Sequence, residues 1–279
     1  MSEYFDKIKP IFFILPALTF AVLFFIIPFI LLFYVSFTQG SSYFFQPIFT
    51  LENYVKIATN YIPDFRNTLM LAALSATLDV IVGYPYAYLL LRKIRFLSDF
   101  FRSILMVPLL GELYIAYGFW WLFLPKGPFS SFLEAIGISP FTILYTPVTA
   151  ALALAIYTLP FAVLQMGINI SQIDPVLEEA SSCLGANRLK RFIHILLPLS
   201  LPGLMSGWFM AFGWNIGAYA IPYLMGGVIV GQRVLSIQIR MVGLLMMNYG
   251  LAAALASALV IISLIFTFIS LKVSRGVLI

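Results

Sequence analysis

Charged residues are scarce in this chain. Asp, Glu, Lys and Arg together make up 10% of its 279 residues, whereas hydrophobic residues make up 62% and the mean hydropathy is +1.02. A soluble domain of ordinary composition carries roughly a quarter charged residues, most of them on its surface. The composition therefore excludes an ordinary soluble domain, and the chain must hide apolar surface in lipid as well as in a core.

The residues that build many enzyme and metal sites are also nearly absent. One cysteine, Cys183, excludes an intrachain disulfide and a multi-cysteine metal site, and one histidine, His194, excludes a histidine metal cluster. The chain has no G-x-x-x-x-G-K-[ST] sequence, so it lacks a phosphate-binding loop of its own. We therefore predict no catalytic residue, no metal and no cofactor on this chain, and an intramembrane enzyme is disfavoured.

Long apolar runs are abundant. A membrane-spanning helix needs about 20 mostly apolar residues, and six segments qualify: about 11–37, 67–91, 103–125, 147–170, 196–224 and 249–271. The first run is about twice as long as the apolar region of a signal peptide, so we interpret it as a retained helix. No linker or internal repeat divides the chain. These features predict an all-α polytopic membrane protein with one domain over residues 1–279.

Prolines and glycines predict irregular helices in two of these spans. Pro16 and Pro28 in the first span indicate kinks within a continuing helix. The fifth span is unusually long and rich in both residue types, so we expect it to be bent or broken and to pack closely against a neighbour. Among its glycines and prolines are Pro202, Gly203, Gly207, Gly213, Gly217 and Pro222.

Basic residues in the loops predict the orientation. Six spans place both termini on one side, and the loops on that side contain eleven Lys or Arg residues against five on the other. The eleven are Lys7, Lys9, Arg92, Lys93, Arg95, Arg102, Arg188, Lys190, Arg191, Lys272 and Arg275. The positive-inside rule places these in the cytoplasm, with both termini. Topology thus accounts for the net charge of +5, and we expect no nucleic-acid partner.

The outer loops are long, at about 38–66, 126–146 and 225–248. Residues 234–244 of the last loop are too few and too polar to span the bilayer. We predict that they form a helix on the outer face or a re-entrant helix.

The most informative loop covers residues 174–195, between the fourth and fifth spans. Asp174 is a good N-cap and Pro175 suits the first helical position. Gly185 suits a left-handed helix end, and Asn187 is placed to cap a second short helix. The apolar residues of the first helix share one stripe: Val176, Leu177, Ala180 and Leu184. The pattern predicts a protruding helix–turn–helix, or a helix that lies on the lipid headgroups.

A motif in this loop resembles one found in a known family. Glu179-Ala180-Ser181 is followed after three residues by Gly185, and after nine more by Ile195-Leu-Leu-Pro198. This pattern resembles the EAA signature of ABC-importer permeases, with Ser181 in place of the second alanine. The resemblance implies that the first helix is a coupling helix, which contacts an ATPase subunit. The contact residues that it implies are Glu178, Glu179, Ala180, Ser181, Gly185 and Ala186.

Other segments resemble the spermidine/putrescine-type permeases of this family: 49–54, 67–69, 83–87, 159–161, 201–203 and 222–227. Permeases for iron, thiamine, phosphonates and some sugars share the general pattern, so the substrate stays open. The resemblance implies a multi-pass plasma-membrane subunit of an ATP-driven importer. Its partners would be two copies of an ATPase that binds ATP and Mg²⁺, a second homologous permease and an extracytoplasmic substrate-binding protein.

Carboxylates inside the spans are candidates for a substrate pathway, because ionisable groups are costly in lipid and usually face a cavity or a partner. Asp79 and Glu112 qualify. We expect Glu112 and neighbouring aromatic residues to contact a cationic substrate through charge and cation–π attraction. Asp79 could instead be protonated, or bonded to Ser75 or to a partner subunit. Further pathway candidates, which could equally be interhelical hydrogen-bonding residues or interfacial anchors, are Tyr117, Trp120, Gln165, Asn169, Trp214, Asn215 and Tyr219.

A stand-alone channel or secondary transporter is the competing class. It would explain six spans and intramembrane carboxylates but not the EAA-like loop. Co-purification of an ATPase distinguishes the two classes.

Overall fold

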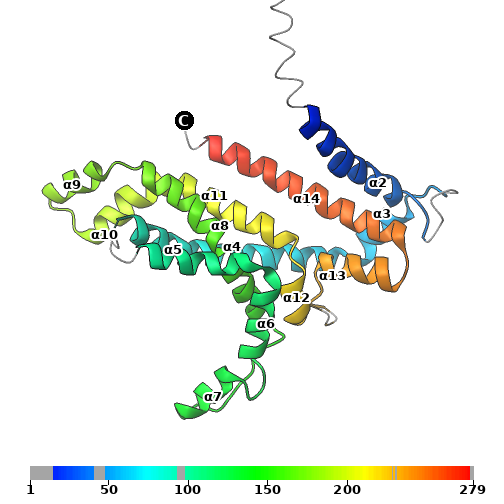
Figure 1. Cartoon of the computed structure of the whole chain (residues 1–279), viewed down its shortest axis with the longest axis horizontal. Coiled ribbons are helices and arrows are strands. Elements are labelled where there is room, and N and C mark those ends of the chain that lie inside the picture. Colours follow the sequence, from blue (N-terminus) through cyan, green and yellow to red (C-terminus); the bar gives the residue numbers. More distant parts are fainter. Residues whose placement is uncertain (1–14, 41–47, 93–97, 228, 230, 277–279) are drawn as a thin grey trace, which may run out of the picture. The chain divides into compact units, whose positions relative to one another are not determined.

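The computed structural model describes residues 15–40, 48–92, 98–227, 229 and 231–276. These residues are mostly helical (Figure 1), and an isolated bridge between Thr38 and Phe49 is the only strand-like pairing among them. They form two compact units, one from residues up to Ile62 plus Gln238–Ala258, the other from Pro63–Ile237 plus the residues from Leu259 onward. Residues 11–14 of the first predicted span and the basic residues Lys7, Lys9, Lys93 and Arg95 lie outside the described ranges.

Five described helices are long and apolar enough to cross a membrane. They run over Leu15–Ser36, Ile62–Arg92, Pro147–Gln172, Arg188–Ile216 and Tyr249–Lys272, and a bent pair, Ser98–Leu110 with Glu112–Leu122, brings the number to six. The predicted all-α membrane fold is confirmed. The orientation of the termini and the single-domain organisation stay predictions.

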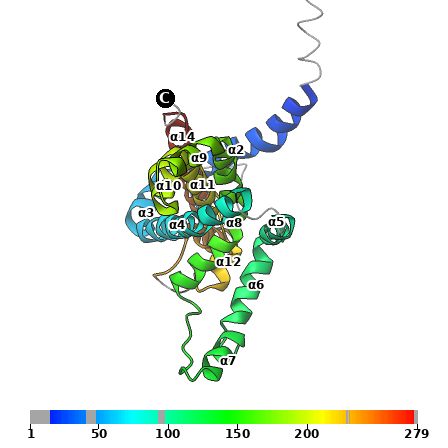
Figure 2. The ribbon, with the colours of Figure 1, turned by 90° about the vertical axis from the view of Figure 1, so that its left-hand side faces the viewer.

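The third span differs from its prediction. We expected one helix over 103–125, but α5 (Ser98–Met106) and a 3-10 turn, η2 (Val107–Leu110), end at Gly111. Gly111 has a φ of +141°, and α6 (Glu112–Leu122) leaves it at an angle of 95° (Figure 2). Pro108 removes a helical N–H donor, and a glycine readily adopts this positive φ. Together they explain why apolar character alone overestimated the continuity of this span.

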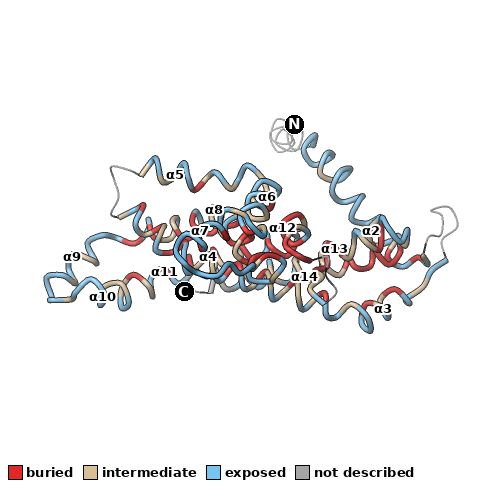
Figure 3. Tube along the Cα trace, turned by 90° about the horizontal axis from the view of Figure 1, so that it is seen from below, coloured by how far each residue is buried: buried red, intermediate tan, exposed pale blue. Residues whose placement is uncertain are grey.

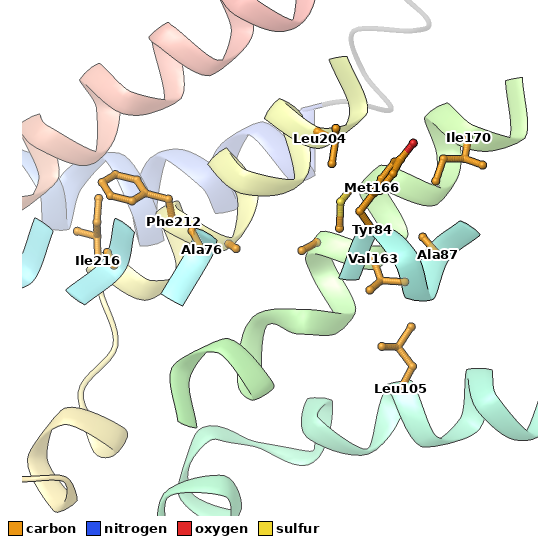
Figure 4. Close-up of a cluster of buried hydrophobic side chains, with 13 residues drawn as sticks. Ala76, Tyr84, Ala87, Leu105, Val163, Met166, Ile170, Leu204, Phe212 and Ile216 are labelled. Carbon is orange, nitrogen blue, oxygen red and sulfur yellow. The ribbon is translucent and has the colours of Figure 1, made fainter. Parts of the chain in front are cut away.

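The second unit is centred on α4 (Ile62–Arg92), α8 (Pro147–Gln172) and α11 (Leu197–Ile216). Its main core cluster includes Ala76, Tyr84, Met166 and Phe212 (Figure 4). The side chains of Leu259, Ile262 and Phe266 from the later part of α14 (Tyr249–Gly276) pack against this cluster. Small residues allow the helices to approach closely, since a Cβ on Gly207 of α11 would lie 2.9 Å from Met166 Cγ on α8.

Two spans contain a widened π turn just before a proline. In the first span the turn is η1 (Val22–Ile26), followed by α2 (Ile27–Ser36) with Pro28 at its second position. In the fifth it is η3 (Phe192–Leu196), ahead of Pro198. A proline cannot donate to the carbonyl four residues earlier and its ring collides with it, so the turn relaxes to the longer i→i+5 bond. The expectation that the first helix would continue through its prolines is confirmed for Pro28.

The fifth span begins and ends earlier in the chain than we predicted, since it runs over Arg188–Ile216. It ends at Ile216 rather than near 224, and α12 (Ala220–Leu224) follows as a separate short helix. The predicted break is thus confirmed, at Gly217, while the predicted end of the span was wrong. Gly217 lies between two helices, where it weakens helical continuity.

The first unit contains α2, α3 (Glu52–Asn60) and the start of α14. Asn53 Nδ2 donates to the carbonyls of Ser36, at 3.0 Å, and Thr38, at 2.8 Å. The N–H of Gly250 donates to the carbonyl of Gly40 at 3.1 Å. These bonds hold the start of α3 and of α14 to the end of α2.

Short helices also occupy the other predicted outer loops. They are α7 (Pro128–Ala135), which follows α6 in the second unit (Figure 1), and α13 (Leu235–Arg240), which continues into η4 (Met241–Leu245). The predicted short helix at 234–244 is confirmed.

The close approach of α8 and α11 can be tested at Gly207. Gly207→Leu should lower the free energy of unfolding by about 1–3 kcal/mol, because the added side chain must displace Met166 or the helices. Thermal unfolding of the purified chain in detergent measures this. Gly213→Ala in the same helix is the control, since a Cβ there meets nothing within 4 Å. Equal stability of Gly207→Leu and the parent chain would contradict the close packing.

Candidate functional sites

The loop after α8 forms the predicted helix–turn–helix. Asp174 Oδ1 accepts from the Val176 N–H at 2.9 Å, and Pro175 occupies the first position of α9 (Pro175–Cys183). Asn187 Oδ1 accepts from the Lys190 N–H at 2.8 Å and begins α10 (Arg188–Arg191). Both predicted caps are confirmed, and they explain why two short helices form here with no buried residue in either.

The end of α9 is a Schellman motif. The N–H of Ala186 donates to Ser181 O and that of Gly185 to Ser182 O, both at 3.0 Å. Gly185 has a φ of +82°, so the predicted left-handed helix end is confirmed. Ser181 Oγ donates to Glu178 O at 2.9 Å, so the serine found in place of the second motif alanine satisfies its hydroxyl on its own helix.

Two adjacent glutamates of α9 lie in different environments. Glu179 is exposed, but the Glu178 side chain is only 14% exposed and pairs with Arg92, itself 15% exposed, at 3.6 Å between Oε1 and Nε. Tyr88 OH donates to Glu178 Oε2 at 3.2 Å. The resemblance implied the same contact role for both glutamates, but only Glu179 is exposed, whereas Glu178 is turned toward Arg92 and Tyr88. Its partners belong to α4, far away in the sequence.

Arg92 also caps the C-terminal end of α8. Its Nη2 donates to Ile170 O at 3.1 Å and to Ile173 O. The last carbonyls of a helix have no intrahelical partner and carry partial negative charge, so a cation there satisfies both needs. On the other side of the loop, Arg191 Nη1 donates to Ser182 Oγ at 2.5 Å and to Glu178 O at 3.4 Å. These bonds define the position of α9.

The apolar stripe of α9 is not covered by the described part of the chain. Leu184 is 89% exposed, and Val176 and Leu177 are also exposed. Figure 3 shows α9 mostly in the colour of exposed residues. Among the predicted contact residues, Glu179, Ala180 and Gly185 are exposed, and Ser181 and Ala186 are partly so. An exposed apolar stripe next to a free carboxylate is suited to binding another surface.

A cavity of about 650 Å³ in the second unit contains some of the predicted pathway residues. Glu112, Gln165 and Trp214 line it, and the other described lining residues are Tyr157, Ser206, Phe209, Met210, Gly213, Gly217, Ala218, Ser263, Phe266, Thr267, Ser270 and Leu271. Glu112 is the only charged group in this set. The cavity is therefore acidic, with aromatic and hydroxyl groups around it.

The Glu112 carboxylate also has a structural role. Its Oε1 accepts from the N–H of Ile221 at 2.9 Å, in the first turn of α12. Glu112 itself begins α6, next to the break at Gly111. The carboxylate thus joins the broken third span to the short helix that follows the fifth.

Asp79 is fully buried and does not line this cavity. Thr158 Oγ1 donates to Asp79 Oδ2 at 2.6 Å, and Asn215 Nδ2 donates to Thr158 Oγ1 at 3.2 Å. The three residues connect α4, α8 and α11. This is the interhelical alternative considered for Asn215, whereas Asp79 accepts from Thr158 and not from Ser75. Ser75 Oγ donates to Leu71 O instead, at 2.5 Å.

The other pathway candidates lie outside the described lining of this cavity. Trp120 Nε1 donates to Tyr145 OH at 3.2 Å, and Tyr117 packs edge-on against Trp120 at 6.5 Å between ring centroids. Asn169 Nδ2 donates to Gln165 O at 3.2 Å, and Tyr219 stacks on Tyr223. The candidates Tyr117 and Trp120 are therefore not among the aromatic residues that line the cavity with Glu112, which are Tyr157, Phe209, Trp214 and Phe266.

Sequence reasoning missed two groups of residues. Ser263, Thr267 and Ser270 line the cavity at spacings of four and three residues, a helical stripe of hydroxyls that periodicity in the sixth span could have revealed. Tyr88 and Arg92 were not connected with α9, because nothing local in the sequence pairs residues about 90 positions apart. Among the described residues, no group of three or more His, Cys, Asp or Glu side chains could hold a metal ion.

A family model matches residues 80–278, and its description is "Binding-protein-dependent transport system inner membrane component". The chain is 30% identical over 211 residues to the spermidine/putrescine transport system permease protein PotB of Escherichia coli, with 74% of this chain and 77% of the relative covered. It is 27% identical over 272 residues to the trehalose/maltose transport system permease protein MalF of Thermococcus litoralis, with 94% and 92% covered.

A solved structure shares the fold. A chain of a bacterial alginate ABC transporter, crystallised with an alginate pentasaccharide-bound periplasmic protein, matches with a TM-score of 0.78 at 18% identity. The match covers 99% of this chain and 98% of that one.

The buried polar contact between α4, α8 and α11 can be tested at Thr158. Thr158→Val should lower the free energy of unfolding by about 1–3 kcal/mol, because Asp79 then keeps no described donor. Chemical unfolding in mixed micelles measures this. Thr59→Val is the control, since that exposed hydroxyl bonds only within its own helix. If both substitutions cost the same, the Asp79–Thr158 bond contributes nothing to stability.

Proposed function

Because the chain belongs to the family of inner membrane components of binding-protein-dependent transport systems, and is thus a permease subunit of an ABC importer in the plasma membrane, we propose that it carries a polyamine or similar organic cation. We further propose that it works with two ATPase copies, a second homologous permease and a substrate-binding protein. ATP and Mg²⁺ would bind the ATPase. In this arrangement both termini are cytoplasmic and residues 1–279 form one permease domain.

The cavity lined by Glu112 is the observation that carries the substrate proposal. A polyamine is a flexible chain of methylenes with cationic amines. Glu112 would attract such an amine, and Tyr157 and Trp214 would contribute through their ring faces, an interaction worth about 0.5–2 kcal/mol when partly desolvated. An acidic substrate would be repelled by the same carboxylate. The similarity to a spermidine/putrescine permease supports the same class of substrate.

A neutral sugar is the second candidate, because a trehalose/maltose permease aligns with 94% of this chain. A sugar needs several hydrogen-bonding partners and gains little from a carboxylate's charge. The cavity offers Gln165 and the hydroxyls of Ser206, Ser263, Thr267 and Ser270, so an uptake assay must include both substrates.

The surface of α9 is the proposed docking site for the ATPase. Its stripe of Val176, Leu177 and Leu184 would enter an apolar groove, and Glu179 would pair with a basic residue of that subunit. Gly185 would matter for shape, since its left-handed conformation ends the helix and turns the chain back toward α10. A stand-alone secondary transporter would have no use for such a surface.

Charge reversal tests the docking proposal. Glu179→Lys should reduce the ATPase co-purified with the permease roughly tenfold or more, which corresponds to about 1.4 kcal/mol or more of binding free energy. The matched control is Glu134→Lys on α7, an exposed glutamate in a predicted outer loop. Undiminished ATPase recovery with both variants would count against docking on α9, and no ATPase with the parent chain would favour a stand-alone transporter.

Neutralising the cavity tests the substrate proposal. Glu112→Gln keeps an acceptor for the Ile221 N–H but removes the charge, so the KM for spermidine uptake should rise about tenfold while protein levels stay unchanged. Radiolabelled spermidine, putrescine, trehalose and maltose are compared in cells that express the whole transporter, with Glu134→Gln as the control. Uptake of a disaccharide and not of either polyamine would show that the substrate proposal is wrong.

A further inference from the structure

One face of α4, near its C-terminal end, contacts α11, η3 and α9. Tyr84, Tyr88 and Arg92 are four residues apart, so their side chains project from the same side of the helix. Tyr84 OH and Ser200 Oγ of α11 share a hydrogen bond of 2.6 Å. The rings of Tyr84 and Tyr88 pack against Phe192 of η3, at 5.6 and 6.4 Å between centroids. Arg92 and Tyr88 then reach Glu178 of α9.

The connection from α4 to α9 is purely non-covalent. The chain itself joins α9 to α8 on one side and to α10 and α11 on the other, so any movement of α9 pulls directly on those helices. Helix α4 has no such link. Among the described residues, its hydrogen bonds and ion pairs to α9 all end on one side chain, Glu178.

The surroundings of Arg92 differ from those of an ordinary surface ion pair. Both side chains are mostly buried, so water screens the pair less than it would at the surface. The guanidinium lies between the last carbonyls of α8, which carry partial negative charge, and the negatively charged Glu178 carboxylate in the first turn of α9. Loss of either partner would leave the other charge half-buried and unpaired, which is costly.

The middle of α4 is bonded to the same group of helices. The Asp79–Thr158–Asn215 contacts join α4 to α8 and α11 within the apolar core. Helix α4 is thus bonded at its middle to α8 and α11 and at its inner end to α9. A displacement of its inner end would reach the bilayer core along a continuous helix of 31 residues.

We propose that Glu178 attaches α4 to the coupling helix through Arg92 and Tyr88, so that span two moves together with α9 when the ATPase closes. Arg92 and Tyr88 are then positioning residues. The two neighbouring glutamates have different roles, since Glu179 faces the ATPase and Glu178 faces the membrane domain. This inference rests on the proposed function, because docking of the ATPase supplies the movement.

The test measures the distance between α9 and α4 in the complex with the ATPase. The only cysteine of the chain, Cys183, is exposed in α9 and accepts one spin label, and Leu89→Cys on the exposed face of α4 accepts the second. With Glu178 intact, the distance distribution should be narrow and unchanged by a non-hydrolysable ATP analogue. Glu178→Gln or Arg92→Gln should broaden it or make it shift with nucleotide, while Arg92→Lys should preserve most of the narrow distribution.

Glu179→Gln is the matched control, one residue away. It should weaken recovery of the ATPase without changing the α9–α4 distance in complexes that form, whereas Glu178→Gln should change the distance at unchanged ATPase recovery. An α9–α4 distance in Glu178→Gln equal to that of the parent would overturn the inference and leave the docking proposal standing. Failure of the labelled and unlabelled parent chains to bind the ATPase would overturn the docking proposal, and the inference with it.

Discussion

A polar group in the bilayer interior has no water to bond, so each one must find its partner within protein. This constraint explains why most of the chain is regular helix, and it also explains what happens at the exceptions. Where the third span breaks at Gly111, the adjoining Glu112 carboxylate accepts from the first turn of α12. Next to the predicted cytoplasmic loop, where α8 ends, the Arg92 guanidinium caps the helix by donating to its last carbonyls. The end of α8 and the start of α12 are thus each bonded by a side chain from another helix.

Under the same constraint, residues of one type have different roles in different parts of the structure. Asp79 and Glu112 are both carboxylates in apolar spans, yet one is enclosed among α4, α8 and α11 and the other borders a cavity. Glu178 and Glu179 are neighbours, yet the side chain of one is mostly buried against Arg92 and the other is exposed. Residue type alone does not assign the task, because the helical rotation of about 100° per residue turns adjacent side chains toward different surroundings.

Local patterns in the sequence predicted local structure well. Asp174, Asn187 and Gly185 act within one turn of themselves, so their roles as caps and helix end follow from residue type and spacing. Apolar length predicted the spans for the same reason. The errors concern features that depend on contacts between distant segments or on backbone geometry. The pairing of Arg92 with Glu178, the cavity lined by α8, α11 and α14, and the 95° turn at Gly111 all depend on how the helices pack.

The bond between Glu112 and the Ile221 N–H has a consequence for biosynthesis. Its two partners are 109 residues apart, and the carboxylate is made first. At a synthesis rate of about 5–20 residues per second, roughly 5–20 s pass before Ile221 even leaves the ribosome. During that time α6 begins with an acid that has no final partner, directly after a half-helix too short to cross the bilayer alone. The bond between α6 and α12 can therefore form only after α12 has been made, which is later than the synthesis of the whole third span.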